Sequence, residues 1–237
     1  MKGRFFLKDG ASGGGKVALV TGGGRRIGAA ICDALGEAGY IVLPTWFTSR
    51  KEARTLAAVW GGKPFRLDLS RPETFRRFAG RLASEYGRLD LLVHNASVFT
   101  RTPLSSVSPA AWDEAFAVNL RGPSFLTREL LPLMASSPEG AGVCFICDAE
   151  ARRLWPSYLP YCLSKIALEA FAKGLKKTVP PGIRVGVVRP GLVLPPPGFA
   201  REQWERLRRR NSSGIRTVAG VCRAILQFAD SEVSVNA

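Results

Sequence analysis

Short apolar segments alternate with helical patterns along most of this chain. The strand-like segments are Val17–Val20, Tyr40–Leu43, Phe65–Leu69, Leu89–Val93, Val143–Cys147 and Arg184–Val188. The runs VALV, LLV and VGVV are apolar at consecutive positions, which is typical of strands buried on both faces of a sheet. Strands that alternate with helices form a parallel sheet through right-handed crossovers, and the helices cover both of its faces. The pattern therefore predicts an α/β fold with a doubly wound sheet.

Helical patterns fill the intervals between these strands. They run over Arg26–Ala38, Arg50–Val59, a helix opened by Ser70 as N-cap with Pro72 in its first turn, Pro109–Met134, Tyr158–Lys177, an Arg-rich segment around Arg206–Arg210, and Val218–Phe228. Six strands in this arrangement predict a single Rossmann-type domain with the strand order 3-2-1-4-5-6. In such a sheet the ligand binds at the carboxyl ends of the strands, where the strand order reverses.

The two ends of the chain depart from this pattern. Residues 1–15 end in the run ASGGG, which has nothing to pack and predicts a flexible leader ahead of one domain over residues 16–237. After Ala229-Asp230 we expect the seventh strand of such domains to be absent, truncated or unrecognisable. No run approaches the roughly 18 apolar residues of a membrane-spanning helix. The five cysteines, an odd number, favour reduced thiols, so we expect a cytoplasmic protein with no membrane partner.

The chain is strongly basic, with 34 Lys and Arg residues against 19 acidic residues and a formal net charge of +15. Such a balance attracts polyanions, so nucleic acid and small ligands that carry several phosphates are both candidate partners. The arginines are scattered, however, and only Arg206, Arg208, Arg209 and Arg210 form a dense cluster. A nucleic-acid-binding arm would concentrate them more, so we expect no nucleic acid. The cluster fits a solvated helix that flanks the substrate loop and attracts an acidic substrate tail.

A glycine-rich segment, TGGGRRIG at Thr21–Gly28, lies directly between the first strand and the first helix. Glycines there let the backbone turn tightly and approach a pyrophosphate, whose charge meets the amino terminus of the helix. Its place in an alternating α/β chain distinguishes this segment from an ordinary glycine-rich turn. We therefore predict a dinucleotide-binding loop that includes Gly22, Gly24, Arg26, Ile27 and Gly28.

The residues after the second strand indicate which dinucleotide is bound. A site selective for NAD places an acidic residue there to bind the ribose 2′-hydroxyl, whereas an NADP site uses a basic residue. This chain has no acidic residue there until Glu52. Charge-assisted hydrogen bonds to a 2′-phosphate could come from Thr48, Ser49, Arg50 and Arg26. We therefore predict NADPH as the cofactor.

Tyr161 and Lys165 form a YxxxK pair one helical turn apart, so both side chains lie on the same face of the helix. A tyrosine with a pKa of about 10 is a poor acid or base at neutral pH unless a nearby positive charge stabilises its phenolate. The ammonium group of Lys165 would supply that charge. The pair therefore predicts a catalytic tyrosine whose pKa is lowered by the lysine.

These residues together resemble the short-chain dehydrogenase/reductase family over nearly the whole chain from Lys16 onward. TGGGRRIG is similar to the family's cofactor loop, and Tyr161 and Lys165 match its catalytic pair. The resemblance extends to Asp68-Leu69, Asn95-Ala96, Asn119 and Arg189-Pro190-Gly191. It implies that Asp68, Leu69, Asn95, Ala96, Ser97, Tyr161, Lys165, Pro190 and Gly191 contact the cofactor. It also implies that Asn119 acts beside the catalytic pair and that the protein is a homotetramer.

Three departures from the family pattern narrow the resemblance to pteridine reductases and the related dihydromonapterin and dihydrofolate reductases. Arg26 replaces the middle glycine of the cofactor loop, Asp148 replaces the catalytic serine that stands 13 residues before the tyrosine, and the motif at Asn95 continues as NASVF. The resemblance implies that Phe99 stacks on a pterin ring. It implies a substrate-binding set of Arg26, Ser97, Phe99, Asp148, Trp155, Tyr161 and Leu192.

The chemistry of Asp148 supports a nitrogen-bearing substrate independently. A serine hydroxyl can donate a hydrogen bond to a ketone oxygen as negative charge grows there, but an ionised aspartate only accepts and would repel the oxyanion. Asp148 could instead accept from the amine or ring N–H groups of a pterin, or pass a proton through Tyr161 to a ring nitrogen. An exposed loop aspartate with no such role is the structural alternative.

The leading hypothesis is therefore an NADPH-dependent reductase that transfers hydride to a C=N bond of a pterin-like substrate, with Asp148, Tyr161, Lys165 and Asn119 as its catalytic residues. The alternatives are a carbonyl reductase of the 3-oxoacyl thioester type and a non-catalytic protein that binds NADP or nucleic acid. We predict no metal site, because Cys144 and Cys147 would lie on opposite faces of a strand. His94, the only histidine, is expected to have a structural role.

Overall fold

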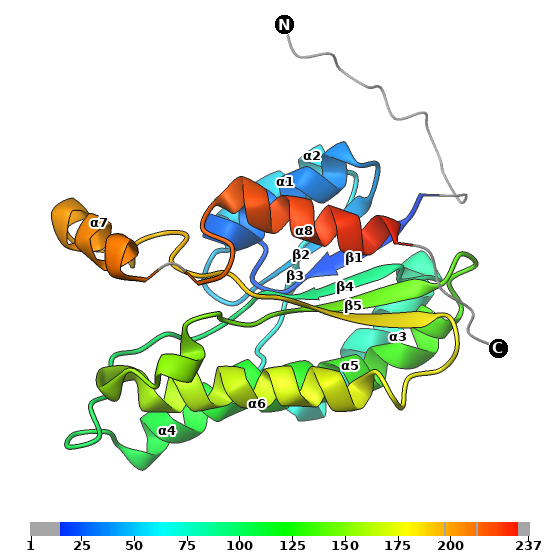
Figure 1. The fold of residues 1–237 in the computed structure, drawn as a ribbon. Coiled ribbons are helices and arrows are strands. Elements are labelled where there is room, and N and C mark those ends of the chain that lie inside the picture. The colour runs from blue at the N-terminus through cyan, green and yellow to red at the C-terminus, as the bar shows by residue number, and fades with distance from the viewer. Residues whose placement is uncertain (1–14, 197, 212, 232–237) are drawn as a thin grey trace, which may run out of the picture.

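The structure is a computed structural model that describes residues 15–196, 198–211 and 213–231 (Figure 1). Its sheet has six strands, all parallel, in the order β3-β2-β1-β4-β5-β6. The strands are β1 (Val17–Val20), β2 (Ile41–Trp46), β3 (Phe65–Arg66), β4 (Leu91–His94), β5 (Ala141–Ile146) and β6 (Ile183–Val188). The predicted doubly wound α/β domain and its strand order are confirmed.

Helices cover both faces of the sheet (Figure 1). On one face lie α1 (Arg26–Glu37), α2 (Arg50–Val59) and α8 (Val218–Asp230), and on the other lie α3 (Phe75–Tyr86), α4 (Pro109–Phe116), α5 (Gly122–Ala135) and α6 (Leu159–Leu175). A further helix, α7 (Arg201–Arg210), stands away from the body beyond the carboxyl end of β6. Both layers therefore leave the carboxyl ends of the strands open to a ligand.

Each face of the sheet has its own hydrophobic core. Along β1, Val17 and Leu19 join the core beneath α3, α5 and α6, whereas Ala18 and Val20 join the core beneath α1 and α8. The same alternation separates Cys144, in the second core, from Cys147, in the first. Both thiols are free and buried, so the CxxC spacing creates no shared site.

Two predicted helices differ in detail. The segment predicted as one helix over Pro109–Met134 is α4 and α5, joined by a π-helical turn at Ala117–Arg121. The Ser70 N-cap was a wrong prediction: a short 3₁₀ helix (Pro72–Thr74) precedes α3 instead. The physical reason is local, because both the backbone N–H and the hydroxyl of Ser70 donate to Asp68, at 2.9 and 2.6 Å. That Asx turn holds Ser70 one residue before Arg71, which takes the N-cap position of the short helix.

The ends of the chain lie mostly outside this description. Apart from Gly15, the predicted leader over residues 1–15 is outside the described residues. The described chain passes from α8 to Ser231, and residues 232–237, where a seventh strand could form, are also outside it. Within the described part of the chain, no helix is long and apolar enough to cross a membrane.

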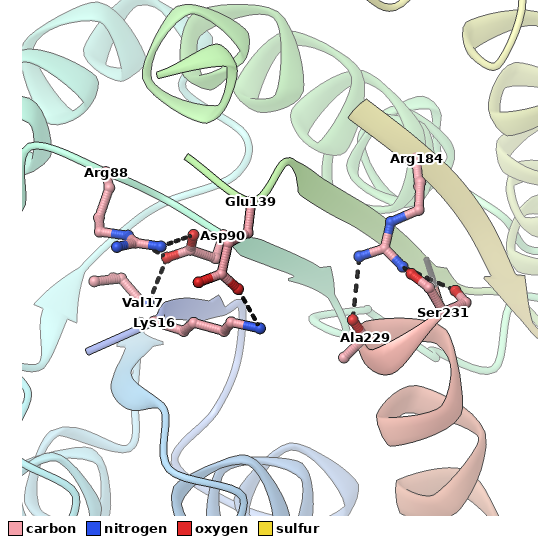
Figure 2. Close-up of polar contacts among 8 residues, drawn as sticks. All are labelled: Lys16, Val17, Arg88, Asp90, Glu139, Arg184, Ala229 and Ser231. Atoms are coloured by element: carbon pink, nitrogen blue, oxygen red, sulfur yellow. Dashed lines mark hydrogen bonds and ion pairs between the residues drawn. The ribbon is translucent and has the colours of Figure 1, made fainter. Parts of the chain in front are cut away.

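Ion pairs close the edge of the sheet where the strands begin (Figure 2). Asp90, buried just before β4, accepts 2.9 and 2.6 Å hydrogen bonds from Arg88 and a 2.7 Å bond from the N–H of Val17. Arg184, on β6, donates to the backbone oxygens of Ala229 and Ser231 at the end of α8. These contacts join β1, β4, β6 and α8 at the edge opposite the open carboxyl ends.

Candidate active site

The loop after β1 has a shape that only glycines permit. Gly22 has a φ of +63°, in the left-handed region. A Cβ on Gly28 would lie 2.2 Å from the carbonyl oxygen of Gly22, and a Cβ on Gly24 would lie 2.6 Å from the hydroxyl oxygen of Ser49. The loop therefore brings bare backbone to the amino terminus of α1, and this cradle fits the pyrophosphate of a dinucleotide.

Hydrogen bonds join this loop to the end of β4, where the strand order reverses. The Thr21 hydroxyl accepts 3.0 Å bonds from the N–H groups of Asn95 and Ala96. The Asn95 amide donates to the carbonyl oxygen of Thr21 at 2.9 Å. Asn95 and Ala96 therefore hold the floor of the crevice in which dinucleotide-binding sheets bind their ligand.

The residues predicted to bind the adenosine half lie at the ends of β2 and β3. Thr48, Ser49 and Arg50 lead into α2, and Asp68 and Leu69 follow β3. These strands are separated from β5, which leads to Asp148, by β1 and β4. The predicted cofactor residues therefore spread along the whole carboxyl edge, as an extended dinucleotide requires.

The sequence analysis missed Arg66 and Phe47, which lie at this end of the site. The Arg66 guanidinium lies 5.9 Å from the ring centroid of Phe47, and that of Arg50 lies 5.8 Å from the ring of Trp46. Phe47 is 55% exposed, so its ring is open to a ligand. No motif marks Arg66, because it becomes a neighbour of the β2 end only through the pairing of β2 with β3.

Arg26 connects the cofactor loop to a distant loop. Its φ is +54°, which a non-glycine residue adopts only at an energetic cost. Its guanidinium donates to the carbonyl oxygens of Pro195, at 2.8 Å, and Leu194, at 3.5 Å, in the loop after β6. Arg26 was predicted near the cofactor phosphates and the substrate. The structure places it between the two loops, with its guanidinium bonded to the second.

Asp148 and Tyr161 form a direct pair. The Tyr161 hydroxyl donates to Asp148 Oδ2 at 2.6 Å, and the N–H of Glu150 donates to Asp148 Oδ1 at 2.7 Å. Burial raises the pKa of Asp148 above its usual range, although both hydrogen bonds act in the opposite direction. Asp148 is therefore not the exposed loop aspartate of the alternative interpretation.

Lys165 does not act on Tyr161 as predicted. Burial, followed by the adjacent Asp148, raises the pKa of Tyr161 well above 10, whereas the sequence analysis expected the lysine to lower it. Lys165 is buried, its Nζ lies 6.0 Å from the centroid of the Tyr161 ring, and it donates to the carbonyl oxygen of Ile146 at 2.8 Å. Burial also lowers the pKa of Lys165. The carboxylate is closer to the phenol than the ammonium, so Tyr161 holds its proton.

Asn119 lies at the centre of a second hydrogen-bond network. It is fully buried in the π-helical turn, a distortion that is frequent at functional sites. Its Oδ1 accepts from Ser97 Oγ at 3.1 Å and from the N–H of Val98 at 2.8 Å, while its Nδ2 donates to the hydroxyl of Ser164 at 3.1 Å. Asn119 therefore connects the loop after β4 to α6, next to Lys165.

An aromatic cluster stands over the phenol. Phe99 stacks on Tyr158 with the ring centroids 4.4 Å apart, and it meets the ring of Tyr161 edge-on at 4.6 Å. Trp155 lies 6.4 Å from Phe99. One face of Phe99 is therefore already covered by Tyr158, a residue the sequence analysis missed. An aromatic side chain three positions before Tyr161 was the available signal.

The loop after β6 closes the site on its last side. The N–H of Ala149 donates to Pro190, and the N–H of Gly191 donates to Ile215, at 2.9 and 2.8 Å. A Cβ on Gly191 would lie 2.0 Å from a backbone oxygen of Ser213, so this approach requires glycine. Leu192, predicted to contact substrate, is buried beyond this turn. Pro190 and Gly191 are thus held beside the strand end that leads to Asp148.

His94 and the cysteines lie outside the chemistry. His94 is buried, stacks on Phe145 and bonds to the Thr127 hydroxyl at 2.8 Å, and burial lowers its pKa to about 3. This arrangement is structural. In the described part of the chain, His, Cys, Asp and Glu side chains do not gather in groups of three that could hold a metal ion.

Comparisons with known proteins agree on the kind of chain this is. The sequence profile described as short chain dehydrogenase matches residues 16–208. A relative from Streptomyces violaceoruber, the granaticin polyketide synthase putative ketoacyl reductase 2, is 33% identical over 184 residues, which cover 76% of this chain and 74% of that protein.

Two solved structures share the fold over most of their length. A 3-oxoacyl-[acyl-carrier protein] reductase from Brucella melitensis superposes with a TM-score of 0.79 at 27% identity, covering 92% of this chain and 91% of the other. FolM alternative dihydrofolate reductase 1 from Brucella canis, complexed with NADP, superposes with a TM-score of 0.78 at 30% identity, covering 90% and 86%.

Proposed function

The chain belongs to the short-chain dehydrogenase family and is a nicotinamide-dependent oxidoreductase; we propose that it uses NADPH to reduce a C=N bond in a pterin-like substrate. Asp148, at the position where the family pattern has a serine, is the observation that carries the proposal. Its carboxylate accepts a 2.6 Å hydrogen bond from the Tyr161 hydroxyl, so it presents an acceptor to the substrate where a serine would present a donor.

The choice of NADPH is supported by the charges at the end of β2. Arg50 and Arg66 lie over the aromatic rings of Trp46 and Phe47, and no acidic residue precedes Glu52 in the segment after β2. Two guanidinium groups can form charge-assisted hydrogen bonds to a 2′-phosphate, which a bare ribose hydroxyl could not match.

The substrate class is supported by the groups around Tyr161. A pterin carries amine and ring N–H donors that the Asp148 carboxylate can accept, and its flat ring suits an aromatic wall such as Phe99, Trp155 and Tyr158. A thioester ketone brings no such donors, and a carboxylate would oppose the negative charge that develops on its oxygen.

The proposed mechanism uses the protonated phenol. When bound, NADPH supplies the hydride. Tyr161, whose raised pKa keeps its proton at neutral pH, donates that proton towards the ring nitrogen that receives negative charge. The Asp148 carboxylate orients the substrate by accepting from its N–H groups, and the Tyr161 phenolate regains its proton from water after the transfer. Lys165 binds the cofactor ribose, and Asn119 positions the lysine through α6.

The second candidate is a 3-oxoacyl thioester reductase. It is favoured by the ketoacyl reductases among the relatives and by a 3-oxoacyl reductase among the solved structures. For this reaction negative charge would develop on a carbonyl oxygen beside the Asp148 carboxylate, and no serine stands at position 148 to stabilise it. The pair geometry therefore favours the first candidate.

The discriminating experiment is an NADPH-oxidation assay with a dihydropterin, dihydrofolate and an acetoacetyl thioester. We expect turnover of at least one pterin-like substrate and little turnover of the thioester, and we expect Asp148→Ser to shift the preference towards the thioester. Turnover of the thioester alone by the wild-type protein would refute the proposed substrate.

We also propose a cytoplasmic homotetramer, as the family resemblance implies. Sedimentation equilibrium of the purified chain tests the assembly, and cell fractionation tests the location. A monomer at micromolar concentration, or recovery of the protein with membranes, would contradict these two proposals.

A further inference from the structure

A cavity of about 390 Å³ lies between α7 and the segment that leads to α8, away from the catalytic pair. It is lined by Glu205, Arg208, Arg209 and Arg216. Figure 1 shows α7 standing beyond the carboxyl end of β6, outside the layers that cover the sheet. The proposed function makes no use of these arginines.

Two arginines build the cavity by bonding to each other's backbone. Arg208 donates to the carbonyl oxygen of Arg216 at 3.0 Å, and Arg216 donates to the carbonyl oxygen of Arg208 at 2.7 Å. One turn earlier on α7, the buried Trp204 packs edge-on against Phe199. The reciprocal bonds fix the last turn of α7 against Arg216, so the guanidinium groups of Arg208 and Arg216 are held in place.

The cavity has unused donors. The Nε atoms of Arg208 and Arg216 are buried, and neither has a hydrogen-bond partner among the described residues. A buried N–H without an acceptor costs about 1–3 kcal/mol, and more when the group is charged. The two guanidinium groups therefore have hydrogen-bonding capacity that the chain itself does not use.

The charge of the lining is strongly positive. Glu205 is the one acidic residue among the lining residues, and it already accepts a 3.1 Å bond from Arg201. Arginines in the last turn of a helix are stabilised by the helix dipole, which could explain Arg208 and Arg209 alone. The dipole does not account for Arg216, which comes from a different segment and lines the same cavity.

The cavity is connected to the active site through a short path. Arg216 follows Ile215, whose backbone exchanges hydrogen bonds with Arg189 and Gly191 in the turn after β6. In the same segment, the N–H of Ser213 donates to the carboxylate of Glu150 at 3.1 Å, and Glu150 is two residues after Asp148 in the chain. The cavity is therefore built on the same segment that closes the site.

We propose that this cavity binds an anionic tail of the substrate, one that carries two or more negative charges as carboxylates or phosphates. The inference rests on the proposed function in one respect, namely that a pterin-like ring carries the tail. The ring would lie against Phe99 and Asp148 while the tail extends to Arg208, Arg209 and Arg216. The pyrophosphate loop after β1 is a separate anion site, formed by other residues.

The first test measures binding without turnover. Isothermal titration, at saturating NADP⁺ to fill the cofactor site, uses two probes: γ-linked triglutamate and inorganic triphosphate. We expect one of them to bind, which identifies the tail as a carboxylate or a phosphate chain. Arg209→Gln should weaken that binding about tenfold, equivalent to the loss of one charge-assisted contact.

Arg210→Gln is the matched control, because it removes the same charge from the same exposed turn but does not line the cavity. It should weaken binding less than twofold. Equal effects of the two variants would overturn the proposal in favour of a diffuse basic surface, as would binding of neither probe. The proposal would also be overturned if Arg209→Gln weakened the binding of an acidic carrier protein more than Arg210→Gln did, while the two variants bound each small anion equally.

The second test measures the tail's contribution to catalysis. The ratio of kcat/KM for a tailed dihydropterin over the same ring without a tail should fall about tenfold in Arg209→Gln and stay constant in Arg210→Gln. An unchanged ratio in both variants would contradict the inference. The titration needs no turnover. If the probes bind as expected but no pterin is reduced, the proposed function is refuted while the anion site is still supported.

Discussion

The two edges of the sheet use charged residues in opposite ways. Where the strands begin, the buried Asp90 receives two hydrogen bonds from Arg88 and one from the backbone of Val17 (Figure 2). Where the strands end, the buried Lys165 bonds to a backbone carbonyl and the carboxylate of Asp148 faces a phenol. The buried carboxylate at the first edge is paired with a cation, whereas the carboxylate at the second edge is bonded to a neutral phenol.

The difference extends to the backbone. At the open edge, Arg26 adopts a left-handed conformation, and burial moves the pKa values of Asp148, Tyr161 and Lys165 away from their usual ranges. Backbone strain and shifted pKa values are frequent at functional sites, whereas paired charges elsewhere mainly stabilise the fold. Stability and chemistry should therefore respond separately to mutation at the two edges.

Loss of the phenol should give the largest effect. Tyr161→Phe removes the proposed proton donor, so we expect kcat to fall about a thousandfold. Steady-state NADPH oxidation measures this, and urea unfolding checks that the variant folds. Tyr158→Phe, which keeps the ring stacked on Phe99, is the control and should lose far less. Near-normal turnover by Tyr161→Phe would remove this residue from the mechanism.

Breaking the closed edge should affect stability alone. Asp90→Asn leaves Arg88 without its carboxylate, so the free energy of unfolding should fall by about 3 kcal/mol while kcat of the folded protein stays unchanged. Chemical denaturation measures the loss. Lys16→Gln breaks the exposed pair with Glu139 at the same edge and should cost less than about 1 kcal/mol. A drop in kcat with Asp90→Asn would mean that the two edges are coupled.

The pH dependence of stability should report His94. Its pKa is about 3 in the folded chain because burial disfavours the charged form, and an unfolded histidine has a pKa of about 6.5. As pH is lowered, His94 therefore gains a proton in the unfolded chain before it does in the folded chain. Its contribution to the free energy of unfolding is present above pH 6.5 and is lost as pH falls below that value.

The expected slope is about 1.4 kcal/mol per pH unit between pH 6 and 5. His94→Gln should remove this contribution, as measured by denaturant unfolding across that range. Equal slopes for the wild-type protein and the variant would show that His94 is not the responsible group.

The smallest effect is expected at the adenosine end of the open edge. Arg50→Gln should lower the preference for NADPH over NADH about tenfold, because one charge-assisted contact to the 2′-phosphate is lost. The ratio of kcat/KM for the two cofactors measures it. Arg54→Gln, on the exposed side of the same helix, should leave the ratio unchanged. If Arg50→Gln leaves the ratio of kcat/KM for the two cofactors unchanged, the contact to the 2′-phosphate would have to come from Arg66 or Arg26.

Local patterns predicted the fold well. The consecutive apolar positions of VALV place Val17 and Leu19 in one core and Ala18 and Val20 in the other. The alternation of strands and helices indicated a doubly wound parallel sheet, and the observed order is a common one for such sheets. The glycines at 22 and 28 were predictable because a tight turn and a close backbone approach exclude any side chain. The spacing of Tyr161 and Lys165 likewise placed both on one helix.

Local patterns were sufficient to predict the layers of the fold, the glycine loop and the candidate chemical groups, because apolar periodicity and turn composition can be read over a few residues. The electrostatic state of those groups depended on packing. The bond from Arg26 to Pro195 spans 169 residues, and Asp148 reaches Tyr161 because the end of β5 lies beside the start of α6. Burial and the nearest charge set a pKa, and both are properties of the packed chain rather than of spacing.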